Sequence, residues 1–210
     1  MSRKISDSTV RRLSLYLRFL EEFERGGTRT VSSRELARRG ATTAAQVRKD
    51  LSLFGSFGKR GRGYDVADLS DHLRDILGLG RRWRVALVGA GRIGTALFEY
   101  ADFRRRGFEI VTVFDSDPGK VGRCLGEVRI EAEEDLERVL AERPVDIAVL
   151  AVPVEAAQGI VDRLAAVGVH GVLNFAPTQL HAPAGVALRD VNMSMELEAL
   201  AFSLSQGPDA

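Results

Sequence analysis

Apolar residues recur at helical spacing in the first third of the chain and predict three short helices. The first covers residues 7–25, with apolar side chains at i, i+4 and i+7, namely Leu13, Leu17 and Leu20. The second begins at Ser32, which has a glutamate three residues later, the spacing of a capping box. Thr43 and Gln46 repeat this spacing ahead of a third helix, whose buried stripe is Val47, Leu51 and Phe54. Two short helices joined by the sequence RGAT are typical of a helix-turn-helix.

The segment GKRGRGYDV, residues 58–66, alternates glycines with cations and ends in a strand-like pattern. We interpret it as the hairpin wing of a winged helix, because glycine lets the backbone approach a phosphate and the cations supply charge. An ordinary surface hairpin is the competing interpretation. Asp50 is expected to orient a nearby cation, since DNA repels a carboxylate. The expected DNA contacts in the third helix and the wing are Gln46, Arg48, Lys49, Ser52, Lys59, Arg60 and Arg62.

The segment LSDHLRDILGLGRRW, residues 69–83, links this region to the rest of the chain. It predicts a short helix that is capped by Ser70 and ended by Gly78 and Gly80. We therefore expect a domain boundary near Arg82.

From residue 83 the pattern changes to buried apolar runs that alternate with helical segments, which predicts a parallel sheet covered by helices. WRVALVGAGRIG, residues 83–94, predicts a strand, a turn and the start of a helix. Its glycines fit the G-x-G-x-x-G of a dinucleotide-binding loop, in which they allow a tight turn, the approach of a pyrophosphate and close helix packing. The expected cofactor contacts of this loop are Gly89, Ala90, Gly91, Arg92, Ile93 and Gly94.

The next predicted strand ends at Asp115, 21 residues after Gly94, where an acidic residue bonds the hydroxyls of the adenine ribose. Ser116 and Asp117 follow in place of an arginine, so a 2′-phosphate would be repelled. The expected cofactors are therefore NADH and NAD+. Lys120 is a candidate contact to the adenosine half.

Two later strands are predicted to end in AVP and NFAP, at the carboxyl edge of the sheet, where ligands lie in doubly wound folds. Val152, Pro153 and Pro177 are accordingly candidates to line the nicotinamide half. An ordinary proline at a helix start is an equally good interpretation of Pro153.

After residue 177 only one more strand and one more helix are predicted, which leaves no room for a catalytic domain. None of His72, His170 and His181 has an evident carboxylate partner, and no Cys/His cluster suggests a metal, so we expect neither an enzyme nor a metal site. The last helix, MSMELEALAFSLSQ, residues 193–206, is apolar on most sides. A partner chain would bury that surface, so we expect a homodimer with this helix in the interface.

Composition adds one feature, an uneven distribution of charge. The net charge is +1, but residues 1–82 hold 18 Lys and Arg against 10 Asp and Glu, whereas residues 83–210 hold 12 against 19. A basic first third indicates an anionic partner, and a solvated arginine-rich surface is the alternative. The sequence has no transmembrane run, no signal-peptide pattern and one cysteine, Cys124, which favour a cytoplasmic protein with a small core or surface role for that cysteine.

Six segments taken in order are similar to the Rex redox-sensing transcriptional repressors: QVRKDLS, GKRGRGY, ILGLGRRW, VGAGRIG, FDSDPGKVG and NFAP. The resemblance covers nearly the whole chain and joins two unrelated modules in register. It implies a winged-helix domain that binds palindromic operators as a homodimer, a Rossmann domain that binds NADH or NAD+, and a C-terminal helix swapped between protomers. It also implies that NADH closes the dimer and releases DNA, so that genes for NADH oxidation are repressed when NADH is scarce.

The resemblance also implies roles for single residues. It implies DNA contacts for Arg12, Arg48, Lys49 and Arg60. It further implies a switch formed by Arg18, by Tyr100 near the nicotinamide, and by an acidic residue at the start of the last helix. That position is Asn192 here, which cannot form a salt bridge with Arg18. Asp190, two residues earlier, is a candidate substitute.

The sequence thus predicts an α/β chain with three parts. These are a winged helix-turn-helix domain over residues 1–82, a Rossmann-type parallel-sheet domain over residues 83–191 and a C-terminal swapped dimerisation helix over residues 192–210. The predicted function is a repressor that binds operator DNA as a homodimer and is released by NADH. Two alternatives stay open: a small NAD-dependent oxidoreductase with an N-terminal extension, and a DNA-binding regulator that senses another nucleotide such as CoA.

Overall fold

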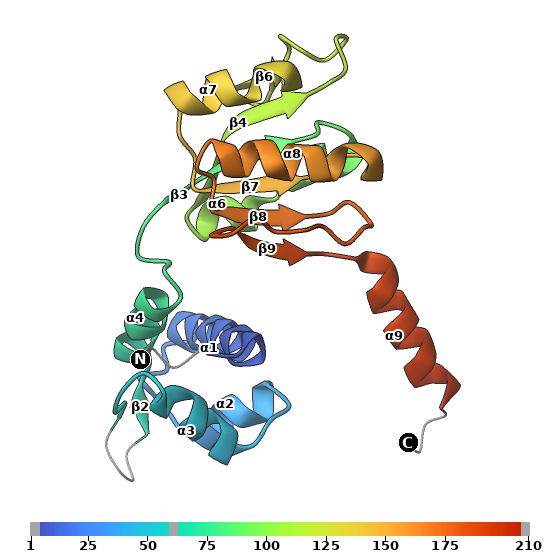
Figure 1. Cartoon of the computed structure of the whole chain (residues 1–210). Coiled ribbons are helices and arrows are strands. Elements are labelled where there is room, and N and C mark those ends of the chain that lie inside the picture. Colours follow the sequence, from blue (N-terminus) through green and yellow to red (C-terminus); the bar gives the residue numbers. More distant parts are fainter. Residues whose placement is uncertain (1–4, 59–62, 207–210) are drawn as a thin grey trace. The chain divides into compact units, whose positions relative to one another are not determined.

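The computed structural model describes residues 5–58 and 63–206, and it divides into two compact units, Met1–Arg81 and Arg82–Ala210. Strands β1 and β2 of the first unit pair antiparallel, with Val31 opposite Tyr64. Helix α1 packs on α4, and α2 packs on α3. The elements of this unit follow the order of a winged helix-turn-helix: α1 (Asp7–Arg25), β1 (Thr30–Val31), α2 (Ser33–Arg39), α3 (Ala44–Ser52), β2 (Tyr64–Asp65) and α4 (Val66–Ile76) (Figure 1).

Side-chain caps fix where the first helices begin. The Ser6 hydroxyl accepts a hydrogen bond from the Thr9 amide at 3.3 Å and starts α1. The capping box of Ser32 and Glu35 forms at α2, as predicted. Only half of the second predicted box forms at α3: the Thr43 hydroxyl accepts from the Gln46 amide at 3.1 Å, but the Gln46 side chain does not return to Thr43.

The prediction that Ser70 caps the linker helix is wrong. Helix α4 begins at Val66, and the Asp65 carboxylate caps it by accepting from the Asp68 amide at 3.1 Å. Ser70 is fully buried one turn inside the helix, where its hydroxyl donates to the Val66 carbonyl. The helix starts early because its apolar stripe starts early, at Val66, and because a carboxylate is a strong cap.

Helices α1, α2, α3 and α4 enclose one hydrophobic core. The predicted stripe of α1 is fully buried, as are Val47 and Leu51 of α3, while Phe54 packs on the core from the turn after α3 and is only partly buried. Each fully buried leucine of this kind contributes about 1.5–3 kcal/mol to folding. Because one face of α3 is held in this core, its opposite face is left to solvent.

The second unit is a doubly wound sheet. Its strand order is β5-β6-β4-β3-β7-β8-β9, and every neighbouring pair is parallel except β5 and β6. Without the short edge strand β5 this is the strand order of a Rossmann fold, with the reversal between β3 and β7. The strands are β3 (Trp83–Val88), β4 (Phe108–Asp115), β5 (Cys124–Leu125), β6 (Val128–Ala132), β7 (Ile147–Leu150), β8 (Gly171–Asn174) and β9 (Ala187–Asp190).

Helices cover both faces of this sheet. Alternate residues of β3 face opposite sides: Ala86 and Val88 pack with α7 and α8, whereas Val85 and Leu87 pack with Leu97 and other residues on the side of α5. The helical segments are α5 (Arg92–Glu99), α6 (Ala101–Arg105), the 3₁₀ turn η1 (Glu133–Asp135), α7 (Leu136–Glu142) and α8 (Val154–Ala166). With both faces covered, ligands have access to the sheet at its carboxyl edge.

Strands β5 and β6 are elements that the sequence did not predict. In β6 the charged residues Arg129 and Glu131 flank Ile130, which is the buried residue of the strand, so it lacks the apolar run of a central parallel strand. Its pairing with β4 defines it instead.

The chain ends in β9 and the exposed helix α9 (Met193–Ser205). All six large apolar side chains of α9 are at least 56 % exposed: Met193, Met195, Leu197, Leu200, Phe202 and Leu204. Among the described residues, no helix has the length and apolar content needed to cross a membrane.

Candidate functional site

The outer face of α3 carries cations. Arg48, Lys49 and Ser52 are exposed, because Val47 and Leu51 hold the opposite face in the core. Arg48 Nη1 donates to Ser33 Oγ at 3.1 Å and so links α3 to the first turn of α2. The Ser52 hydroxyl donates to the Lys49 carbonyl at 2.8 Å. The predicted recognition helix therefore presents two cations and a hydroxyl to solvent.

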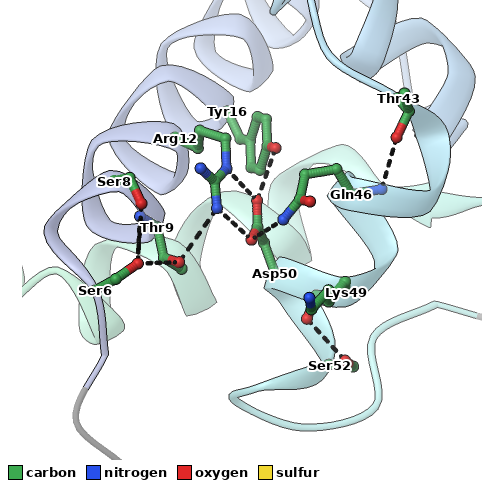
Figure 2. Close-up of polar contacts among 10 residues, drawn as sticks. All are labelled: Ser6, Ser8, Thr9, Arg12, Tyr16, Thr43, Gln46, Lys49, Asp50 and Ser52. Atoms are coloured by element: carbon green, nitrogen blue, oxygen red, sulfur yellow. Dashed lines mark hydrogen bonds and ion pairs between the residues drawn. The ribbon is translucent and has the colours of Figure 1, made fainter.

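A buried carboxylate lies behind this face. Asp50 is 1 % exposed, and Figure 2 shows it between α3 and α1. Arg12 of α1 donates to it twice, from Nε to Oδ2 at 2.6 Å and from Nη2 to Oδ1 at 2.8 Å. The Tyr16 hydroxyl donates to Oδ2 at 3.0 Å. The cation that Asp50 orients is thus Arg12, 38 residues away in the chain.

Gln46 completes the surroundings of Asp50 by donating from Nε2 to Oδ1 at 2.8 Å. Burial alone would raise the pKa of the Asp50 carboxyl, but the hydrogen bonds from Arg12, Gln46 and Tyr16 outweigh burial and lower it. Asp50 is therefore ionised at neutral pH. Burial, together with the hydrogen bond to Asp50, raises the pKa of Tyr16 to about 12. This bond to Asp50 is also why the Gln46 side chain does not complete a capping box.

The two ends of the predicted wing meet. A Cβ on Gly58 would lie 2.4 Å from the carbonyl oxygen of Gly63, and both glycines have positive φ. The chain beyond Gly63 pairs with β1 as strand β2. The base of a tight loop is therefore in place, and Lys59, Arg60 and Arg62 lie outside the described residues.

The second unit holds a cavity of about 630 Å³ at the carboxyl ends of β3, β4 and β7, where the strand order reverses. This volume is within the usual range for small-molecule sites. Eight of the predicted cofactor residues line it: Gly89, Gly91, Arg92, Ile93, Asp115, Lys120, Val152 and Pro153. The predicted loop and the predicted acidic residue thus share one site.

Each glycine of the loop has a separate geometric reason. Gly89 has φ +97°, and a Cβ there would lie 2.3 Å from the Ala151 carbonyl oxygen. A Cβ on Gly94 would lie 1.8 Å from the Gly89 carbonyl oxygen, so this glycine lets α5 pack under the turn. A Cβ on Gly91 would meet nothing within 4 Å, which leaves its backbone open at the cavity. Tight turn, close packing and open approach are the three uses that the motif implies.

Asp115 is the last residue of β4, and hydrogen bonds hold both oxygens of its carboxylate. Oδ2 accepts from the Ala90 amide at 2.7 Å and from Lys120 Nζ at 3.0 Å, and Oδ1 accepts from the Asp117 amide at 2.8 Å. Burial favours a raised pKa for this carboxyl, but the three donors outweigh burial and lower it. Ala90, which does not line the cavity, contributes to the site through its backbone amide.

Ser116 and Asp117, which were expected beside the adenine ribose, also line the cavity, and five lining residues were not anticipated: Val88, Glu133, Ala151, Ala156 and Ile160. Glu133 follows β6, so recognising that strand would have placed it at the carboxyl edge. Arg163 of α8 contacts Glu133 and donates to Glu137 from Nε at 2.6 Å and from Nη2 at 2.7 Å, which lowers the pKa of Glu137 to about 2. This ion network fixes η1, α7 and α8 beside the cavity.

Four predicted cofactor residues lie outside the cavity lining: Ala90, Gly94, Tyr100 and Pro177. Gly94 is buried under the turn. Tyr100 follows the far end of α5 and is 53 % exposed, and its ring packs edge-to-face with that of Phe103, with centroids 5.2 Å apart. A cofactor contact of Tyr100 therefore stays a prediction.

The side-chain amides of Asn192 and Asn174 hold the chain at the start of α9. Asn192 Oδ1 caps the helix by accepting from the Ser194 and Met195 amides at 3.0 and 3.3 Å. Buried Asn174, at the end of β8, donates to Asp190 Oδ1 at 2.8 Å. The Asn192 side chain thus has a local task as a helix cap, and Asp190 is tied to β8. Arg18 is exposed on α1, in the other unit.

The described residues contain no group of three or more His, Cys, Asp and Glu side chains that could hold a metal ion. Cys124 is an exposed free thiol on β5. On the surface of α4, His72 Nδ1 lies 2.7 Å from the Asp68 carbonyl oxygen and 3.9 Å from Asp68 Oδ1, and the His72 and Phe57 rings pack edge-to-face.

Comparison with known proteins relates both units to one family. Residues 4–52 match the family described as putative DNA-binding protein N-terminus, and residues 81–178 match the CoA binding domain family. The redox-sensing transcriptional repressor Rex of Carboxydothermus hydrogenoformans is 47 % identical over 96 % of this chain and 97 % of that protein.

Solved structures agree. RSP, a Rex-family repressor, in complex with β-NAD+ and operator DNA superposes with a TM-score of 0.93 at 35 % identity, over 97 % of this chain and 94 % of that one. RSP in complex with β-NADH superposes with a TM-score of 0.88 at 34 % identity, over 96 % and 95 % of the two chains. On this identity and coverage, the chain belongs to the Rex family of redox-sensing transcriptional repressors.

Proposed function

We propose that this protein is a transcriptional repressor that binds operator DNA as a homodimer and releases it when NADH binds. One observation carries the proposal: a helix-turn-helix with a cationic outer face and a dinucleotide cavity with an acidic strand end occur in one chain. RSP has been crystallised with NADH alone and with NAD+ and operator DNA, which is the pairing of ligands that such a switch requires. The ligands need only differ in affinity for the two DNA-binding states.

We assign DNA contact to α3 and to the wing. Arg48 and Lys49 are exposed cations suited to phosphates or guanine, and the Ser52 hydroxyl is suited to a base edge. Arg12 and Gln46 complete the assigned contacts, and both are held near these residues by the hydrogen bonds that they donate to Asp50. Lys59, Arg60 and Arg62 are assigned from the sequence of the wing. DNA affinity is expected to fall steeply with salt, by a log–log slope of about 0.9 for each phosphate neutralised.

We assign the cavity of the second unit to NADH and NAD+. The open backbone at Gly91 and the start of α5 suit a pyrophosphate, and the Asp115 carboxylate suits the adenine ribose hydroxyls. A 2′-phosphate would meet Asp115 and Asp117, both of which line the cavity. Arg18, Tyr100 and Asn192 are the proposed switch. Because Asn192 is uncharged and its Oδ1 already caps α9, its part in the switch rests on the Nδ2 donor, whose partner is the Tyr100 hydroxyl and not the Arg18 guanidinium, which only donates.

We assign the homodimer interface to α9, which has apolar side chains on most sides and buries none of them within its own chain. Burying six such side chains against a partner is worth roughly 1.5–3 kcal/mol for each one that becomes fully buried. A twofold dimer also matches a palindromic operator, since each half-site takes one helix-turn-helix.

The match of residues 81–178 to the CoA binding domain family favours one second candidate, a DNA-binding regulator that senses CoA through the same loop. A competition titration separates the two: CoA displaces bound NADH under the second candidate and does not under the first. We assign no catalytic step to the cavity, and NADH absorbance followed in the same titration tests for turnover by an oxidoreductase.

The experiment is fluorescence anisotropy of a labelled palindromic duplex that the protein has selected from a random-sequence pool. We expect NADH to release the duplex at concentrations at which NAD+ does not. Lys49→Ala serves as a control that weakens DNA binding and leaves NADH affinity unchanged, because the two sites lie in different units. If NADH and NAD+ act alike, or if neither acts, the proposed redox response is wrong.

A further inference from the structure

The amide of Gln46 is held in one orientation. Asp50 is ionised and can only accept, so the atom of Gln46 that lies 2.8 Å from Asp50 Oδ1 is the donor Nε2 and not Oε1. The two residues are one helical turn apart and share a face of α3. No described residue donates a hydrogen bond to Gln46 Oε1, and Gln46 is only partly buried. The acceptor end of this amide is therefore free for a ligand.

The carboxylate that holds Gln46 is itself held firmly. Arg12 engages both carboxylate oxygens, and the Tyr16 hydroxyl adds a third bond from α1 (Figure 2). Bidentate pairing of this kind fixes the plane of the carboxylate. Arg12 Nη2 also donates to Thr9 Oγ1 at 3.2 Å, which fixes the guanidinium in turn. Asp50 thus cannot turn to follow a different orientation of Gln46 without breaking contacts to α1.

We propose that Asp50 is a positioning residue for base recognition, which holds Gln46 with Oε1 outward so that Gln46 accepts a hydrogen bond from the amino group of adenine or cytosine. This inference rests on the proposed function of α3 as the recognition helix. In the major groove adenine N6 and cytosine N4 donate, whereas guanine O6 and thymine O4 only accept. A freely rotating glutamine satisfies either kind of base edge. When Asp50 holds Gln46, a guanine or thymine oxygen would face Gln46 Oε1, which is also an acceptor. This unpaired contact disfavours guanine and thymine relative to adenine and cytosine.

The test uses the full-length protein and the duplex selected from a random pool, together with every single base-pair substitution of that duplex. Relative affinities are measured by competition anisotropy. For the unaltered protein we expect one position of each half-site at which adenine or cytosine is preferred over guanine and thymine. One hydrogen bond predicts a preference of about twofold to tenfold. Gln46→Ala is expected to level the preference at that position and to leave the other positions unchanged.

Two further variants test the role of Asp50. Asp50→Ala keeps Gln46 but frees its amide, and we expect the same preference to be levelled. Tyr16→Phe is the matched control, because it removes a hydrogen bond from the same carboxylate and leaves the bond to Gln46. We expect Tyr16→Phe to lower thermal stability and to keep the base preference. If Asp50 had a merely structural role, Asp50→Ala and Tyr16→Phe would not differ in base preference.

The outcomes decide separately on the inference and on the proposed function. An unaltered protein that binds no duplex from the pool contradicts the proposed function. A protein that binds well but has no position at which Gln46→Ala levels a preference for adenine or cytosine contradicts the inference alone. An Asp50→Ala variant that weakens all duplexes equally and keeps the preference also overturns it. Should Asp50→Ala fail to fold, the comparison of the unaltered protein with Gln46→Ala still decides.

Discussion

Gly91 and Gly94 lack side chains for different physical reasons, and this predicts two different defects. Gly94→Ala would place a Cβ 1.8 Å from the Gly89 carbonyl oxygen, so the turn must open and α5 must move. We expect a loss of about 2–4 kcal/mol of stability, comparable to other severe packing defects, and no NADH binding. Gly91→Ala puts its methyl group in open space at negative φ, so stability is expected to change by less than about 0.5 kcal/mol.

NADH affinity is nevertheless expected to fall sharply in Gly91→Ala, because the new methyl group stands where the backbone would meet a phosphate. Thermal unfolding and NADH fluorescence titration of both variants check the pair. If the two variants lose stability equally, or if Gly91→Ala binds NADH normally, the assigned roles of the loop are wrong.

Tyr16 predicts a loss of stability at alkaline pH. Burial raises its pKa from 10.0 to about 12 in the folded protein, so the folded state binds the phenolic proton more tightly than the unfolded state does. The resulting stability is complete below pH 10 and is lost as the pH rises from 10 to 12, by about 3 kcal/mol. Urea unfolding of the protein and of Tyr16→Phe between pH 9 and 12 measures this. The difference between the two in free energy of unfolding is expected to shrink over that range, and a constant difference would contradict the assigned burial.

At the scale of helices and strands, the sequence predicted those elements that carry their own signals. Helix α1 has a cap, an apolar stripe and a closing glycine within residues 6–26, and its bounds were predicted correctly. Strand β3 has an apolar run and a glycine turn. Strands β1 and β6 have neither, since they are defined by pairing with residues 35 and 17 positions away, Thr30 with Asp65 and Val113 with Ile130. Local patterning does not contain that information.

The same distinction divides the candidate sites. The glycine loop and Asp115 were predicted, because their spacing is a local consequence of one strand–helix–strand unit. Glu133 was missed together with β6. Gln46 was expected to form a capping box, in which its side chain would accept from the Thr43 backbone amide. The side chain instead donates to Asp50, because a hydrogen bond to an ionised carboxylate is stronger than one from a solvated backbone amide.

We expect the Asn174 side chain to be the main contact that holds the loop after β8. Its fully buried side chain donates to the Ala176 and Thr178 carbonyls and to Asp190, and accepts from the Ala176 amide at 2.8 Å. Asn174→Ala would leave several of these groups without a partner, so we expect a loss of about 3 kcal/mol in the free energy of unfolding. Gln158→Ala is the matched control, because Gln158 holds the same loop at His181 through exposed hydrogen bonds and is expected to cost less than about 1 kcal/mol. Urea unfolding compares them, and equal losses would mean that the buried amide is not what holds the loop.

At the scale of the whole molecule, charge and apolar surface are divided between different parts of the chain. Residues 1–82 carry a net charge of +8, as 18 cations against 10 anions, and residues 83–210 carry −7, as 12 against 19. Anionic DNA is therefore attracted to one unit and repelled by the other. The large apolar surface of α9 belongs to the acidic part. Binding of a nucleic acid and association with a second copy are thus expected to use separate surfaces.

Substitutions in helix α9 test whether association with a second copy uses this surface. Leu200→Asp and Phe202→Asp place a carboxylate at positions that are 56 % and 65 % exposed in the single chain, so the folded protomer is expected to accept either change. In a dimer that buries these positions, an unpaired charge costs several kcal/mol, and sedimentation velocity at micromolar concentration is expected to show a monomer. Ser205→Asp, which adds the same charge at the last residue of the helix, is expected to stay dimeric. A monomer has one helix-turn-helix for two half-sites, so palindrome affinity is expected to fall to that for a single half-site. If both apolar variants stay dimeric, the interface lies elsewhere on the chain and the exposed apolar face of α9 requires another partner.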